Sequence, residues 1–175
     1  MTKTASKTSL ATKIIFLFCI ASVLFLFLTP IIFFDYGTSY GIGIKAIWGY
    51  QAILGIGSRE IYASDGSLFR SMTFDFNWQI YITCLLFILI GFTTYFIGPR
   101  AKGYYIFSAI LLAVCAIICF ASKSWFVNAT IHIGLGSGIG DSARAHLGVG
   151  PWASGFLACF GAVACIFEYK TFKLR

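Results

Sequence analysis

The hydrophobic positions of this chain fall into long uncharged runs separated by segments of a different pattern. Four runs, residues 14–34, 80–97, 103–122 and 147–167, contain no Asp, Glu, Lys, Arg or His. At the helical rise of about 1.5 Å per residue, each is long enough to cross the hydrocarbon core of a bilayer. The pattern predicts four transmembrane helices. Residues 98–102 connect the second run to the third, so these two form a tight helical hairpin.

The segments 35–79 and 123–146 carry a two-residue period instead. Apolar residues alternate with glycine and polar residues from Tyr40 to Gly57, which favours extended chain over helix. Asp65 and Gly66 stand between two further apolar stretches, and this pair favours a hairpin turn. A similar alternation around 131–139 predicts one more strand, paired with the first segment. The expected fold class is an all-α membrane protein, a four-transmembrane-helix bundle with a small antiparallel β-sheet formed by the two outer loops.

Composition supports this interpretation. Of the 175 residues, 59% are hydrophobic and only 11% are charged, which is about half the charged share of a soluble domain. A soluble protein of this length could not bury so much apolar surface. Residues 1–175 are therefore expected to form a single membrane domain.

The basic residues predict the orientation. The two terminal segments and the 98–102 connection hold eight basic residues and one acid, Glu168, and so carry the whole net charge of +7. The other two loops are neutral overall. The positive-inside rule places both termini on the cytoplasmic side of the cell membrane. These residues need no nucleic-acid partner, because topology and lipid headgroups account for them. A cleaved signal peptide is the alternative for residues 14–34, but the run is longer than a signal core.

No catalytic, cofactor or metal constellation emerges, and no small-molecule substrate can be named. Ionisable residues, which usually mark ion and proton paths, are missing from all four runs. His132 and His146 stand in one loop, too far apart in sequence for a typical zinc motif. The glycine series at 134–140 lacks the ending of a phosphate loop. Six cysteines lie inside the runs and are expected to act as small packing residues: Cys19, Cys84, Cys115, Cys119, Cys159 and Cys165.

The fourth run is unusually rich in small residues. Small residues four apart allow close helix contact in membranes. Three such pairs occur: Gly155 with Cys159, Ala158 with Ala162, and Gly161 with Cys165. Two interpretations stay open. This helix is central to its own bundle, or one face of it binds a partner protein.

Two short segments carry a resemblance. Residues 48–55 (WGYQAILG) and 147–152 (LGVGPW) are similar to segments of small bacterial four-span membrane proteins, and the layout of the chain resembles the claudin and peripheral-myelin family. The resemblance implies four helices with a strand-rich first outer loop. The outer-loop cysteine pair and the Gly-Leu-Trp triplet of claudins are absent. Junction-forming and selective-pore roles therefore do not carry over residue by residue.

The favoured function is a non-enzymatic membrane subunit that contacts lipids and binds other membrane proteins or further copies of itself. The expected outer contact residues are Trp48, Tyr50, Gly134, Gly136 and Gly138. The alternative is an oligomeric pore or channel subunit, with Thr93, Thr94 or Ser108 near the path.

Overall fold

Four long helices dominate the structure, a computed structural model that describes residues 9–35, 44–56, 58–62, 66, 68–74, 76–129, 131–134 and 145–172. The helices are α1 (Leu10–Leu28), α3 (Trp78–Phe96), α4 (Gly103–Ala129) and α6 (Val149–Thr171). A short 3-10 turn, η2 (Gly98–Arg100), joins α3 to α4. All four helices are long and apolar enough to cross a membrane, which confirms the predicted number of spans.

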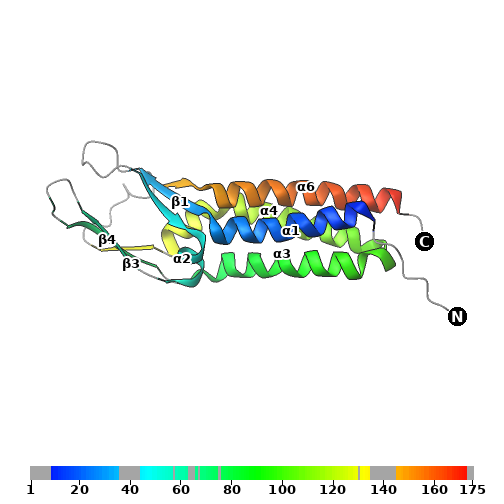
Figure 1. Ribbon diagram of the computed structural model, residues 1–175, viewed down its shortest axis with the longest axis horizontal. Coiled ribbons are helices and arrows are strands. Elements are labelled where there is room, and N and C mark those ends of the chain that lie inside the picture. Colours follow the sequence, from blue (N-terminus) through cyan, green and yellow to red (C-terminus); the bar gives the residue numbers. More distant parts are fainter. Residues whose placement is uncertain are drawn as a thin grey trace.

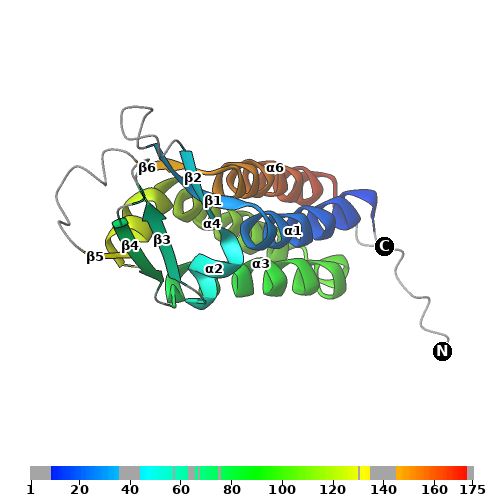
Figure 2. The same ribbon diagram turned by 60° about the vertical axis from the view of Figure 1, so that its left-hand side comes forward.

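The helices form a four-membered bundle in which α1 and α4 are each flanked by α3 and α6 (Figure 1). The closest packing is that of α6 against α4 and α1. The start of α1, the end of α6 and the turn η2 lie at one end of the bundle, and every strand lies at the other (Figures 1 and 2). We call these the inner end and the outer end.

Side-chain caps fix where two of the helices begin. The Oγ of Ser9 accepts a hydrogen bond from the N–H of Thr12, and the Oδ1 of Asn77 accepts one from the N–H of Ile80, both at 3.1 Å. These bonds satisfy N–H groups that have no partner inside a first helical turn. Helix α1 therefore begins at Leu10, ahead of the predicted start at residue 14, and includes Lys13.

The prediction of one helix across residues 14–34 is wrong in its last part. Helix α1 ends at Leu28, and Pro30–Asp35 is strand β1. Proline disfavours helical backbone at the preceding residue and has no N–H of its own for a helical hydrogen bond. Pro30 therefore ends the helix at Leu28, with Thr29 as its cap, although the run stays apolar.

The strands form two antiparallel sheets of three strands each. The order in the first is β2 (Ile44–Trp48), β1, β6 (Ala145–Leu147), and in the second it is β3 (Ser58–Tyr62), β4 (Leu68–Phe74), β5 (Ile131–Gly134). The β3–β4 hairpin was predicted, as was a strand from the second loop paired with the first loop. The first sheet was not expected. Its strand β6 precedes α6, and Phe33 of β1 pairs with His146 of β6.

The extended chain predicted for residues 40–57 is also interrupted. Gly49–Leu54 form a short helix, α2, which buries Gly49, Ala52 and Ile53. This i, i+3, i+4 spacing is that of one helical face, and in this short segment it overlaps with the alternating pattern. Helix α4 runs past the predicted end at residue 122 as far as Ala129.

Candidate interaction site at the outer end of the bundle

The outer end of α1, with the strand β1 that follows it, is a junction to which two separate parts of the chain are tied. The N–H of Gly49, at the start of α2, donates to the carbonyl of Thr29 at 3.0 Å, and the N–H of Gly148, just before α6, donates to the carbonyl of Ile31 at 2.6 Å. Thr29 caps α1 itself, since its N–H donates to the carbonyl of Phe25. Backbone carbonyls around the end of α1 thus accept hydrogen bonds from both loop segments at the outer end, the one before α3 and the one after α4.

Glycine is required where these segments meet α1. A Cβ at Gly49 would lie 1.8 Å from the carbonyl oxygen of Leu26, and a Cβ at Gly148 would lie 2.2 Å from that of Pro30. A Cβ at Gly150 would lie 2.9 Å from the carbonyl oxygen of Phe25. The obstructing atoms belong to backbone, so they cannot rotate away. These three glycines come from the two segments that carried the bacterial four-span resemblance, 48–55 and 147–152.

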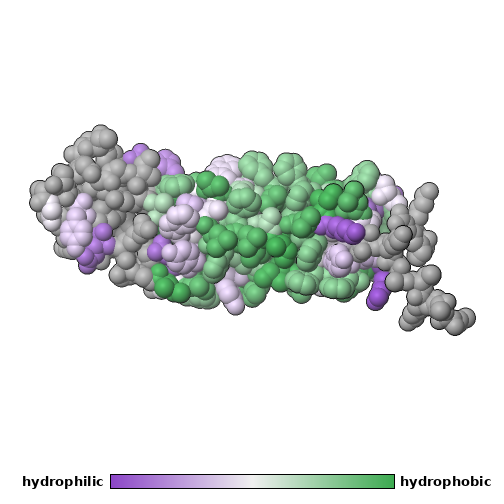
Figure 3. Space-filling view, in the orientation of Figure 1, coloured by the Kyte–Doolittle hydropathy of each residue, from purple (hydrophilic) through white to green (hydrophobic). Residues whose placement is uncertain are grey.

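Exposed aromatic side chains surround the junction. Trp48 precedes α2, Trp78 begins α3 and Trp152 lies in the first turn of α6, with exposed fractions of 39%, 58% and 47%. Below them, the face of the bundle seen in Figure 3 is mostly hydrophobic, with hydrophilic residues near both ends. Tryptophan and tyrosine favour the boundary between lipid and water. The arrangement suits a membrane boundary at this level.

The residues expected to form an outer contact surface are only partly brought together. Trp48 and Tyr50 are two residues apart at the start of α2, each 39% exposed, and the Tyr50 ring packs near that of Phe27. Gly134 is the last residue of β5 and pairs with Ser71 in the other sheet. Gly136 and Gly138 lie outside the described residues.

The small residues of α6 divide between two faces. Gly155, Ala158, Gly161 and Cys165 are buried, whereas Cys159 is exposed and Ala162 is half-buried. A Cβ at Gly155 would lie 2.6 Å from the Phe120 ring, and the Oγ of Ser154 donates to the carbonyl of Ser22 at 2.8 Å. The buried small residues thus let α6 approach α4 and α1, which favours the interpretation that this helix is central to its own bundle.

The cysteines lie as packing residues would. All six are free, and all except Cys159 are buried in the bundle, with at least one on each helix. In the part of the chain that the structure describes, no group of three His, Cys, Asp or Glu side chains is placed to hold a metal ion. His132 and His146 belong to strands of different sheets, β5 and β6.

Buried hydroxyl groups of the bundle bond either to each other or to backbone carbonyls. The Oγ1 of Thr94 and the Oγ of Ser108 are 2.9 Å apart between α3 and α4, and both residues are buried. Thr93 instead donates to the carbonyl of Leu89 in its own helix. The buried pair joins two helices of the same chain.

This pair predicts a measurable coupling. In a double-mutant cycle of Thr94→Val and Ser108→Ala, we expect an interaction free energy of about 0.6 kcal/mol, the average for hydrogen bonds between membrane helices. Unfolding in detergent mixtures measures it. The matched cycle of Thr93→Val with Ser108→Ala should give a value near zero, because Thr93 bonds only to its own helix. Equal values for the two cycles would contradict this prediction.

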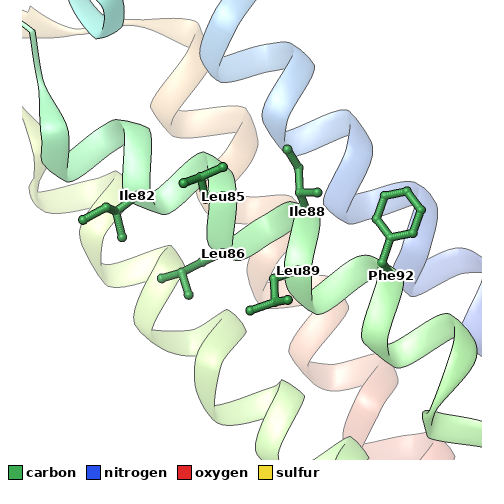
Figure 4. Close-up of a pocket in the computed structure, with 6 residues that line it drawn as sticks. All are labelled: Ile82, Leu85, Leu86, Ile88, Leu89 and Phe92. Atoms are coloured by element: carbon green, nitrogen blue, oxygen red, sulfur yellow. The ribbon is translucent and has the colours of Figure 1, made fainter.

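Open grooves occur on the outside of the bundle, and two of them are lined by described residues. One, of about 500 Å³, lies on α3 and is lined by apolar side chains alone: Ile82, Leu85, Leu86, Ile88, Leu89 and Phe92 (Figure 4). It offers no polar group to orient a ligand. The other, of about 560 Å³, lies at the inner end between α1 and α6 and includes Ser9 and Glu168.

No protein-family model matches this chain, and no curated protein matches it at a significant level.

Proposed function

We propose that this chain is a multi-pass protein of the cell membrane whose inner end, with both termini, faces the cytoplasm. Support comes from the charges, because Lys13, Arg100, Lys102 and Lys170 all lie at the inner end. Among the residues described at this end, Glu168 is the one acid. Cytoplasmic flanks of membrane helices carry such an excess of basic residues.

Accessibility of introduced cysteines tests this orientation. In intact cells, a membrane-impermeant maleimide should label Tyr62→Cys, on the exposed β3 edge, but label Ala101→Cys only after the cells are opened. The unaltered chain is the control, because five of its cysteines are buried and Cys159 lies in the middle of α6. Labelling of Ala101→Cys in intact cells would contradict the proposal.

Within that membrane, we infer that the protein is a non-enzymatic assembly subunit whose outer sheets bind another membrane protein or a second copy of the chain. The observation that carries this inference is the junction at the end of α1, which holds strand β1 and the starts of α2 and α6 together by backbone hydrogen bonds. A rigid support of this kind pre-organises a binding surface and lowers the entropy cost of association.

Edge strands provide the means of association. Strands β2 and β6 are the edges of one sheet, and β3 and β5 are the edges of the other. Edge strands present backbone groups that can pair with a further strand. On β3, the hydroxyl of Tyr62 donates to the carboxylate of Glu60, and this hydrogen bond raises the pKa of Tyr62. The two side chains share one face of an exposed strand, and tyrosine is enriched in protein interfaces.

The interior gives less support to a pore. Thr94 and Ser108, the residues named for a path, are buried and bonded to each other, while Thr93 bonds to its own helix. A channel would need a wetted route, and the described core is made mainly of apolar side chains, with the buried hydroxyl groups in hydrogen bonds. We therefore favour assembly over conduction.

The mass of the protein extracted in native lipid discs tests the assembly proposal. One chain has a mass of 19.2 kDa, so a defined larger complex is easily distinguished from a monomer. The complex should be lost when an edge strand is blocked by Arg59→Pro or Glu60→Pro. Adjacent residues of an edge strand direct their N–H groups to opposite sides. One of these two substitutions therefore removes an N–H group from the β3–β4 ladder, and the other removes an N–H group only from the free edge. A monomer in native lipid would overturn the proposal.

A further inference from the structure

The groove at the inner end is bounded by two helices that are far apart in sequence. Helix α1 contributes Leu10 and Ile14, and helix α6 contributes Phe160, Val163 and Phe167. These walls are apolar, and Leu10, Phe160, Val163 and Phe167 are each more than half exposed. From Glu168 to Phe160 the groove follows α6 for about 12 Å, at 1.5 Å per residue. This inner groove is thus an open, apolar slot that suits the acyl chain of a lipid.

Its inner mouth is polar, which distinguishes it from the groove on α3. Glu168 and Ser9 lie there, and Glu168 is only half-exposed. Among the described residues, no cation forms an ion pair with the Glu168 carboxylate. A partly buried carboxylate that pairs with none of the described cations favours a ligand that supplies a positive charge.

Each of the two helices carries a lysine close in sequence position to the groove-lining residues. Lys170 follows Val163 by seven residues, which places both on one face of α6, and Lys13 follows Leu10 by three on α1. Both lysines are exposed. Neither lysine lines the groove, but Lys13 directly precedes the lining residue Ile14 and Lys170 follows Glu168 by two residues. Donors for an anion therefore lie within one helical turn of the acceptor for a cation. A zwitterionic headgroup carries this same pair of charges.

We propose that the inner groove binds one phospholipid with a primary-amine headgroup, such as phosphatidylethanolamine. Its ammonium donates to the Glu168 carboxylate, its phosphate lies near Lys13 and Lys170, and an acyl chain fills the apolar slot. A choline headgroup has no N–H to donate, and a glycerol headgroup brings no cation. The chemistry therefore ranks phosphatidylethanolamine above phosphatidylcholine and phosphatidylglycerol. This proposal is independent of the assembly function, which lies at the outer end.

Native mass spectrometry of the full-length, delipidated protein tests this ranking. Synthetic phosphatidylethanolamine, phosphatidylcholine and phosphatidylglycerol with identical acyl chains are added separately. The protein should retain one phosphatidylethanolamine at about a tenfold lower lipid concentration than either other lipid, as expected for a charge-assisted hydrogen bond. Equal retention of the three lipids would overturn the proposal.

Variants separate the headgroup contact from the slot. Glu168→Gln should retain the amine lipid no better than the choline lipid, and Ala164→Leu, which fills the slot, should reduce retention of both. Leu89→Trp fills the α3 groove instead and should leave the preference unchanged. A preference that survives in Glu168→Gln would overturn the proposal. Formation of a dimer when lipid is removed would also overturn the proposal, because a second copy of the chain would then fill the inner groove.

Discussion

Replacing Gly49 by alanine should strongly destabilise the protein, by about 3 kcal/mol, the upper range for overpacking. The added Cβ would stand 1.8 Å from the carbonyl oxygen of Leu26, so either α2 or the end of α1 must move. Movement would break the hydrogen bond from Gly49 to Thr29 and release strand β2 from the junction. The expected result is a lower unfolding temperature and a smaller folded yield in detergent, measured by thermal unfolding and gel filtration.

Gly103→Ala is the matched control for this substitution. Gly103 begins α4, and a Cβ there meets nothing within 4 Å. Alanine is favoured over glycine in helices, so this variant should be neutral or slightly stabilising. If both variants unfolded at the same temperature, the close contact at the end of α1 would be contradicted.

Loss of the Tyr105 ring should be the most damaging change at the inner end. Tyr105 of α4 is 1% exposed, and its hydroxyl and the Oγ1 of Thr12 in α1 are 2.8 Å apart. The ring also covers Gly98 of η2, where a Cβ would lie 3.0 Å away. Tyr105→Ala would leave a cavity between these elements and cost about 3–5 kcal/mol, as large-to-small changes of aromatic residues do.

Two variants isolate the role of the ring. Tyr105→Phe keeps the ring and loses one hydrogen bond, so it should cost about 1 kcal/mol. Tyr104→Ala, next in sequence but only half-buried, should cost less than Tyr105→Ala. Equilibrium unfolding of the three variants gives the comparison. A Tyr105→Phe variant as unstable as Tyr105→Ala would show that the hydroxyl, rather than ring packing, holds the inner end together.

The helices could be predicted from sequence because a charge is costly in lipid wherever it occurs, so uncharged runs mark the spans directly. The same rule could not locate the end of α1. Residues 30–34 are as apolar as the helix before them, but they form the central strand of a sheet. Hydropathy alone does not separate a buried strand from a helix, and the decisive signal was Pro30.

The junction was less accessible to prediction. Its glycines contact carbonyls far away in sequence, and a glycine that permits a long-range approach has the same local pattern as one in a turn. The local pattern around Gly49 thus predicts an alternating strand. The hairpin and the strand β5 were easier, since turn residues and a two-residue period are local signals. The small residues of α6 were recognised, but only packing showed which of them are buried.

The pairing of strands has a consequence for synthesis of the chain. Each sheet combines two strands that precede α3 with one that follows α4: β6 completes the first sheet and β5 the second. While the ribosome is still making the α3–α4 hairpin, β1 and β4 each have one open side. The outer part can therefore close only after that hairpin has been threaded through the bilayer, so a chain that stalls earlier would present unpaired edges to quality control.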